Sequence, residues 1–130
     1  MQLKDALALL THKSFYPEGP QSWADLGCGS GLFTSALASL LHSGSEIYAV
    51  DSNASALKKI SSPNNVVIKP VQSDFITDNL DFNKLDGIMM ANSFHYVKDK
   101  PAFIHKARLY LKPGSCFLIV EYDMDRQVPN

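Results

Sequence analysis

Residues 23–32 read Trp23-Ala24-Asp25-Leu26-Gly27-Cys28-Gly29-Ser30-Gly31-Leu32. This stretch joins a short apolar run that ends in an acid to three glycines at alternate positions, and residues 33–41 follow with the pattern of a helix. Glycine has no Cβ, so it can adopt positive φ in a tight turn and let a ligand approach the backbone. The N–H groups and the positive dipole end of the helix would face that turn. A strand, a glycine turn and a helix in this order are typical of the first unit of a nucleotide-binding α/β domain.

The spacing of the glycines discriminates between kinds of nucleotide site. Dinucleotide folds use G-x-G-x-x-G, whereas Leu32 stands here in place of the third glycine and Gly31 comes one residue early. A P-loop needs a lysine after its last glycine, and none follows Gly31. What remains is the pattern acid-x-Gly-x-Gly-x-Gly, whose meaning depends on the rest of the chain.

The composition is that of a single globular domain. The chain has 130 residues, and its hydrophobic content of 45% supports a core and argues against disorder. The net charge is −1, with Lys and Arg scattered, so nucleic acid is not the favoured partner.

Cys28 and Cys116 lack metal ligands at a short spacing, so we predict free thiols and no metal site. No stretch resembles a signal peptide or a membrane span, and we therefore predict a cytoplasmic protein without a membrane partner.

Apolar periodicity and turn residues divide the chain into alternating helices and strands. The expected strands are residues 22–26, 46–51, 66–68, 85–91 and 116–122. The expected helices are residues 3–13, 32–41, a segment from Ser52 or Asn53 to Ile60, and 101–111. The turn Lys112-Pro113-Gly114-Ser115 ends the last of these helices. These assignments rest on helical faces, caps and β-branched runs. We predict an α/β fold: a Rossmann-like doubly wound parallel sheet of about five strands with helices on both faces. The domain would comprise a helix and connector (1–21), the core (22–122) and a tail (123–130).

Polar residues gather at the carboxyl ends of the expected strands, where open α/β sheets bind ligands. Asp25 and the glycines follow the first strand, Asp51 the second, Asp74 the third and residues 92–95 the fourth. Asp51 could accept hydrogen bonds from both hydroxyls of a ribose, or cap the next helix. Asp74 could bind the amino group of an adenine while Phe75 covers its ring, or the two could form a turn beside the core.

Five motifs in order carry a resemblance to a known family. They are Asp25-Leu26-Gly27-Cys28-Gly29-Ser30-Gly31, Tyr48-Ala49-Val50-Asp51, Ser73-Asp74-Phe75, Asp86-Gly87-Ile88-Met89-Met90-Ala91-Asn92 and Leu111-Lys112-Pro113-Gly114. Together they resemble the motif set of the class I S-adenosylmethionine (SAM)-dependent methyltransferases over nearly the whole chain. Residues 92–97, Asn92-Ser93-Phe94-His95-Tyr96-Val97, depart from the Asn-Pro-Pro-Tyr signature of enzymes that methylate amino groups of nucleobases or glutamine. They look more like small-molecule methyltransferases of the ubiquinone-biosynthesis type.

The resemblance implies SAM as the cofactor and a small molecule as the methyl acceptor. In such enzymes the glycine turn holds the methionine end of SAM, the acid after the second strand binds the ribose, and the acid–aromatic pair reads the adenine. Ser52 would pack near the adenine, and the main chain at Asn92 would line the methionine amine. The cofactor-binding residues carried over are Asp25, Gly27, Cys28, Gly29, Gly31, Asp51, Ser52, Asp74, Phe75 and Asn92.

A catalytic base is needed only where the acceptor must lose a proton, because positioning can supply most of the acceleration of an in-line methyl transfer. His95 is the candidate base, since an unperturbed imidazole has a pKa of about 6.5. Alternatively it orients the substrate or forms part of the wall. The other histidines, His12, His42 and His105, fall on expected helices or their ends and are predicted on the surface. Phe15 and Tyr16 could close over the cofactor or pack against the sheet.

The expected fifth strand, residues 116–122, would have an unpaired apolar edge. Methyltransferases of this type continue into two more strands, but residues 123–130 offer no strand pattern. Because proteins protect such edges, we expect either a homo-oligomer that pairs there or a chain that is part of a longer protein. Three functions stay open: a small-molecule methyltransferase, a SAM-binding module without catalysis of its own, and an NAD-type nucleotide-binding domain, which Leu32 disfavours.

Overall fold

The computed structural model describes residues 1–11, 17–58, 60 and 62–121. In chain order its elements are α1 (Leu3–Thr11), β1 (Ser22–Leu26), α2 (Leu32–Leu40), β2 (Glu46–Asp51), α3 (Ala54–Leu57), β3 (Val67–Gln72), β4 (Leu85–Ala91), the 3₁₀ helix η1 (Phe94–Tyr96), α4 (Lys100–Arg108) and β5 (Leu111–Val120). None of the helices in these ranges is long and apolar enough to cross a membrane.

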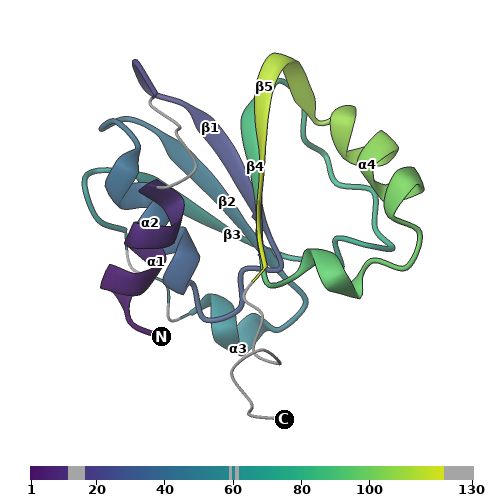
Figure 1. The fold of residues 1–130 in the computed structure, drawn as a ribbon, viewed down its shortest axis with the longest axis horizontal. Coiled ribbons are helices and arrows are strands. Elements are labelled where there is room, and N and C mark those ends of the chain that lie inside the picture. The colour runs from purple at the N-terminus through teal and green to yellow at the C-terminus, as the bar shows by residue number, and fades with distance from the viewer. Residues whose placement is uncertain (12–16, 59, 61, 122–130) are drawn as a thin grey trace, which may run out of the picture.

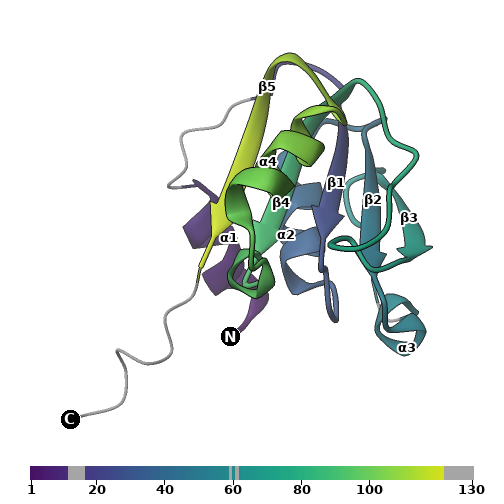
Figure 2. The same ribbon diagram turned by 90° about the vertical axis from the view of Figure 1, so that its right-hand side faces the viewer.

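The strands form one parallel sheet in the order β3-β2-β1-β4-β5. The chain runs outward from the central strand β1 to β3 and then returns to β4 on the other side of β1. The strand order therefore reverses between β1 and β4, which is where open α/β sheets bind ligands. Helices α1 and α2 cover one face of the sheet and α4 covers the other (Figures 1 and 2). The predicted α/β class and doubly wound parallel sheet are confirmed.

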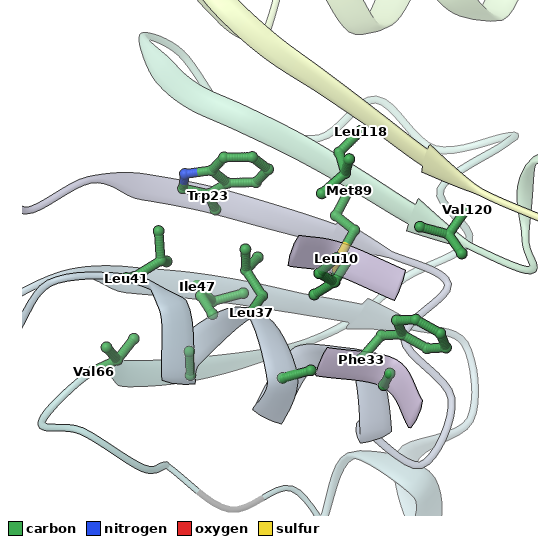
Figure 3. Packing of buried hydrophobic residues seen from close by; sticks show 13 residues of the cluster. Leu10, Trp23, Phe33, Leu37, Leu41, Ile47, Val66, Met89, Leu118 and Val120 are labelled. Carbon is green, nitrogen blue, oxygen red and sulfur yellow. The ribbon is translucent and has the colours of Figure 1, made fainter. Parts of the chain in front are cut away.

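Residues of β4 alternate between two apolar cores. Met89 packs with Trp23 on the face covered by α1 and α2 (Figure 3). Ile88 and Met90 point to the opposite face, where they pack with Phe103 of α4. A strand covered on both faces must be apolar at successive positions, and this explains the unbroken apolar run at the end of β4.

A close approach between β1 and β4 requires the glycine at position 87. A Cβ built on Gly87 would lie 2.5 Å from ring atoms of Trp23, which is shorter than any ordinary carbon–carbon contact. The absence of a side chain at Gly87 thus lets the indole ring, which is 1% exposed, lie flat against the neighbouring strand.

The predicted bounds of three strands, 22–26, 46–51 and 85–91, are confirmed, whereas two elements in the middle of the chain have other lengths. The third strand is not limited to residues 66–68 but is β3, which reaches Gln72 and pairs with β2 along its whole length. Pro70 is tolerated because β3 lies at the edge of the sheet, where a proline need not donate to a second neighbour. The helix predicted to reach Ile60 ends at Leu57, and Asn53, not Ser52, caps it.

The C-terminal helix and strand were predicted with the wrong boundary. Helix α4 begins at Lys100, after the capping side chain of Asp99, and ends at Arg108 rather than at residue 111. The segment predicted as a turn, 112–115, belongs to β5, which begins at Leu111 and pairs with β4 through a register shift. The predicted ends of the first helix at Lys13 and of the fifth strand at Tyr122, and the tail 123–130, lie outside the described residues.

Candidate functional site

A cavity of about 1350 Å³ opens at the carboxyl ends of the strands, at the reversal point between β1 and β4. Its lining comes from the glycine turn, the ends of β2, β4 and β5, and η1. The predicted site residues that line it are Asp25, Gly27, Cys28, Gly29, Asp51, Ser52, Phe75, Asn92 and His95. The fold thus brings together residues from four separate strand ends, whereas Gly31 and Asp74 are not part of this wall.

The glycine turn between β1 and α2 adopts backbone conformations that favour glycine. Gly27, Gly29 and Gly31 have φ values of +76°, +56° and +91°. The backbone N–H groups of Gly27 and Cys28 both donate to the carbonyl of Val50, at 2.8 and 3.0 Å, which ties the turn to β2. A Cβ on Gly27 would lie 2.7 Å from Cβ of Ser93. Gly31 is the N-cap residue before α2 and supplies no capping side chain, so it leaves the N–H groups of the first turn of this helix without a side-chain cap.

Asp51 joins the end of β2 to the glycine turn. Its Oδ2 accepts a hydrogen bond from the backbone N–H of Gly29 at 2.8 Å, and its Oδ1 accepts one from the N–H of Asn53 at 2.9 Å. The cap of α3 is instead the side chain of Asn53, which accepts from Ser55 and Ala56. Asp51 is therefore not the helix cap, and its carboxylate lies at the cavity wall beside the turn.

Asp25 is the one buried carboxylate among the described residues that line the cavity, with an exposed fraction of 1%. Its Oδ2 accepts a hydrogen bond from the hydroxyl of Thr34, while no residue in the described ranges hydrogen-bonds its Oδ1. Burial raises the pKa of Asp25 to about 7; the Thr34 hydrogen bond opposes the rise and the negative charge of Asp51 adds to it. A buried acceptor without a partner is costly unless a donor or cation reaches it.

The remaining residues predicted to contact adenine behave differently from each other. Phe75 lines the cavity and makes an edge contact with Phe103, with the ring centroids 5.8 Å apart. Asp74 lies in a smaller hollow of about 470 Å³, and its Oδ1 accepts hydrogen bonds from the N–H groups of Ile76 and Thr77. Its local geometry is that of a turn-forming aspartate, and a contact between Asp74 and adenine stays a prediction.

The segment after β4 is fixed to both neighbouring strands. Asn92 has φ of +57°, a conformation that asparagine tolerates better than most residues, and its backbone N–H donates to the carbonyl of Val120 at 2.7 Å. The buried hydroxyl of Ser93 donates to the carbonyl of Leu26 at 2.7 Å. These bonds hold η1 and its His95 at the cavity wall.

His95 has a carboxylate partner that sequence reasoning missed. Its Nδ1 lies 3.1 Å from Oε2 of Glu121, and both side chains line the cavity. Glu121 was assigned to the interior of the strand 116–122, although it is an acid at the carboxyl end of a strand, as Asp25 and Asp51 are. That signal could have identified it.

None of the other lining residues was predicted as a site residue, although several lie within the quoted motifs. The other lining residues are Met1, Ser30, Leu32, Phe33, Ala91, Ser93, Phe94, Tyr96 and Lys100, and most of them read as ordinary core or surface positions. His42 and His105 are exposed, as predicted. His12, Phe15 and Tyr16 lie outside the described residues.

Burial, followed by the charges of Asp25 and Asp51, raises the pKa of the Cys28 thiol, so this cysteine is uncharged at neutral pH.

Known proteins with a similar fold are methyltransferases. Coclaurine N-methyltransferase bound to N-methylheliamine and S-adenosylhomocysteine (SAH) has a TM-score of 0.75 at 20% identity, covering 90% of this chain and 35% of that chain. A SAM-dependent methyltransferase from Aquifex aeolicus has a TM-score of 0.70 at 18% identity, covering 94% of this chain and 73% of that one. Haemonchus contortus phosphoethanolamine N-methyltransferase 1, in complex with phosphoethanolamine and SAH, has a TM-score of 0.70 at 19% identity. The match covers 92% of this chain and 26% of that chain. At these identities the similarity shows the fold.

The sequence itself matches a family model. Comparison with curated protein sequences finds no match. The chain spans about a third of the first of these structures and about a quarter of the nematode enzyme. The family model described as methyltransferase domain matches residues 24–117, from β1 into β5. The matched region is most of the chain and contains nearly all of the strand ends that form the cavity. The chain therefore belongs to the methyltransferase domain family.

Proposed function

We propose that this chain binds SAM in the cavity at the strand ends and transfers its methyl group to a small-molecule acceptor. The observation that carries the proposal is the buried Asp25, whose Oδ1 has no hydrogen-bond partner among the described residues, next to the start of α2, where Gly31 supplies no capping side chain. The amino acid end of SAM bears an ammonium and a carboxylate. The first suits an unpartnered carboxylate oxygen, and the second suits the N–H groups of a helix N-terminus.

The remaining cofactor contacts follow from the lining of the cavity. Asp51 accepts from the ribose hydroxyls, Ser52 packs beside the adenine, and Phe75 covers one side of the base. Gly27 and Gly29 leave the turn without side chains, so the methionine part approaches the backbone closely. When bound, SAM supplies an electrophilic methyl group on a sulfonium.

The acceptor side of the cavity lies at η1. His95 takes a proton from an acceptor that must lose one, and Tyr96 and Lys100 form the wall around it. A second candidate is a SAM-binding module without catalysis of its own. The family match gives no support to an NAD-type domain. A cytoplasmic location stays a prediction.

Calorimetric titration with SAM, SAH and NAD tests the cofactor assignment. We expect SAM and SAH to bind and NAD to give no heat of binding, because only the first two carry an amino acid end with both an ammonium and a carboxylate. Binding of NAD alone would overturn the proposal, and so would the absence of binding by all three. Formation of SAH from SAM with a panel of small amines and phenols then separates an enzyme from a binding module.

The open edge of the sheet at β5 is proposed to pair with a second copy of this chain. Strand β5 pairs with β4 and with no other strand in the described part of the chain, and an open apolar edge invites a partner strand. Light scattering is expected to give the mass of a homo-oligomer. A monomeric mass at high concentration would contradict this pairing.

A further inference from the structure

We propose that Glu121 is a positioning residue that holds His95 in its proton-accepting form, and that the pair selects acceptors whose nucleophilic oxygen or nitrogen carries a proton. This inference rests on the proposed function, since it concerns the acceptor side of the same cavity. It starts from the contact between two side chains on neighbouring strand ends.

The contact is built into the sheet. His95 lies on η1 just after β4, and Glu121 follows β5, which is the neighbour of β4. The hydrogen bond of 2.7 Å from the N–H of Asn92 to the carbonyl of Val120 holds the two segments together. The side chains then meet with 3.1 Å between Nδ1 and Oε2.

The chemistry of the contact determines which nitrogen carries hydrogen. An ionised carboxylate can only accept hydrogen bonds, so Nδ1 of a neutral His95 must be the donor to Glu121. The neutral ring has one N–H, which leaves the lone pair on Nε2. No residue in the described ranges hydrogen-bonds Nε2, so this nitrogen is available to a ligand in the cavity.

A second contact limits the rotation of the imidazole ring. The Tyr96 ring packs against it with the centroids 4.1 Å apart. The other Lys, Asp and Glu side chains that line the cavity are Lys100, whose ammonium donates to the carbonyl of Val97 at 2.9 Å, and the carboxylates Asp25 and Asp51. Among the carboxylates that line the cavity, Glu121 is thus the one bonded to His95.

The resulting step balances without a further reactant. The lone pair of the acceptor oxygen or nitrogen forms a bond to the methyl carbon, and the carbon–sulfur bond breaks with its electron pair left on sulfur, which becomes a neutral thioether. The proton of the acceptor passes to Nε2 of His95, and water later removes it. Such a pair gains nothing from an acceptor that is already an anion, so the acceptors it favours are neutral phenols, alcohols and amines that carry an N–H.

A stabilising ion pair would be the simpler role for this contact, but its exposure argues against it. The side chains of His95 and Glu121 are 53% and 37% exposed, and exposed pairs contribute little to stability. Glu121→Ala should therefore leave thermal unfolding almost unchanged while altering the imidazole.

Nitrogen-15 NMR of the histidine side chains in the whole chain tests the inference without any assay of activity. His95→Gln identifies the signals of His95. In the wild type at a pH where the ring is neutral, we expect hydrogen on Nδ1. In Glu121→Ala we expect this hydrogen to move largely to Nε2. The control Glu18→Ala removes an exposed glutamate outside the cavity, and we expect it to show the wild-type pattern. Hydrogen on Nε2 in the wild type, or the same pattern in Glu121→Ala, would overturn the proposal.

Kinetics give the second readout once the acceptor panel has identified a substrate. We expect Glu121→Ala to lower kcat roughly tenfold or more with a proton-bearing acceptor, with little change in KM, and to leave the affinity for SAH unchanged. An unchanged kcat would overturn the positioning role. Failure of the wild type to bind SAH would instead refute the proposed function, and the tautomer measurement distinguishes the two failures.

Discussion

Asp51→Ala is expected to weaken the binding of SAH about 100-fold. The substitution removes the charged acceptor of the ribose hydroxyls, and a charge-assisted hydrogen bond of this kind is worth about 1.5–3 kcal/mol. It also releases the backbone N–H of Gly29, which Asp51 holds at 2.8 Å, so the glycine turn loses a restraint. A 100-fold change corresponds to roughly 2.7 kcal/mol. Calorimetric titration of SAH into the variant measures it.

Two further variants separate the ribose contact from a general loss of structure. Asp51→Asn keeps one oxygen that can accept from Gly29 but loses the charge, and we expect roughly a tenfold loss of affinity. Asp81→Ala removes an exposed carboxylate that does not line the cavity and should bind SAH like the wild type. If folded Asp51→Ala bound SAH as tightly as the wild type, the assignment of Asp51 to the ribose would be wrong.

Asp25 is expected to make the protein less stable as the pH rises from about 4 to about 7. Its pKa is raised to about 7 in the folded state, chiefly by burial, from an ordinary value of 3.8. In this window the unfolded chain has released the proton while the folded protein retains it, so the free energy of unfolding falls with increasing pH. At about 1.4 kcal/mol per pH unit, the contribution of Asp25 is on the order of 4 kcal/mol.

Asp25→Asn removes this titration, and its effect on stability should therefore depend on pH. Relative to the wild type, the free energy of unfolding of the variant should increase by on the order of 4 kcal/mol between about pH 4 and about pH 7. The pH dependence of this difference is the readout, because the new amide adds a constant cost wherever it lacks a partner. Urea unfolding at several pH values measures it. A difference independent of pH would show that Asp25 titrates normally.

The same carboxylate links binding to protons. If the ammonium of SAH docks on Asp25, binding favours the ionised carboxylate, so the affinity should rise with pH up to about 7 and protons should be released on binding below that pH. Calorimetry in buffers of different ionisation enthalpy counts these protons. Asp25→Asn should abolish the part of the release that Asp25 contributes, and an unchanged release would place the ammonium elsewhere.

Sequence patterns located the elements whose signals are local. The bounds of β1, β2 and β4, the glycine turn and the acid at position 51 follow from apolar runs and turn residues that act within a few positions. The extent of β3 could not be read in this way, because pairing with β2 holds Lys69 and Pro70 extended against their weak preference for strands. Residues 112–115 fall within β5 for another reason: the register passes from Leu85–Leu111 to Gly87–Cys116, so they form an irregular insertion in the strand that has no register partners in β4.

By itself, the sequence determined the fold class, the family motifs and the set of strand ends at which a site forms, because each depends on the local order of residue types. Only the tertiary structure decided how those residues are paired. It left Oδ1 of the buried Asp25 without a partner in the described residues, and it brought His95 against Glu121, 26 positions away. Strand order creates such contacts between distant segments, and neither residue alone carries a sign of the other.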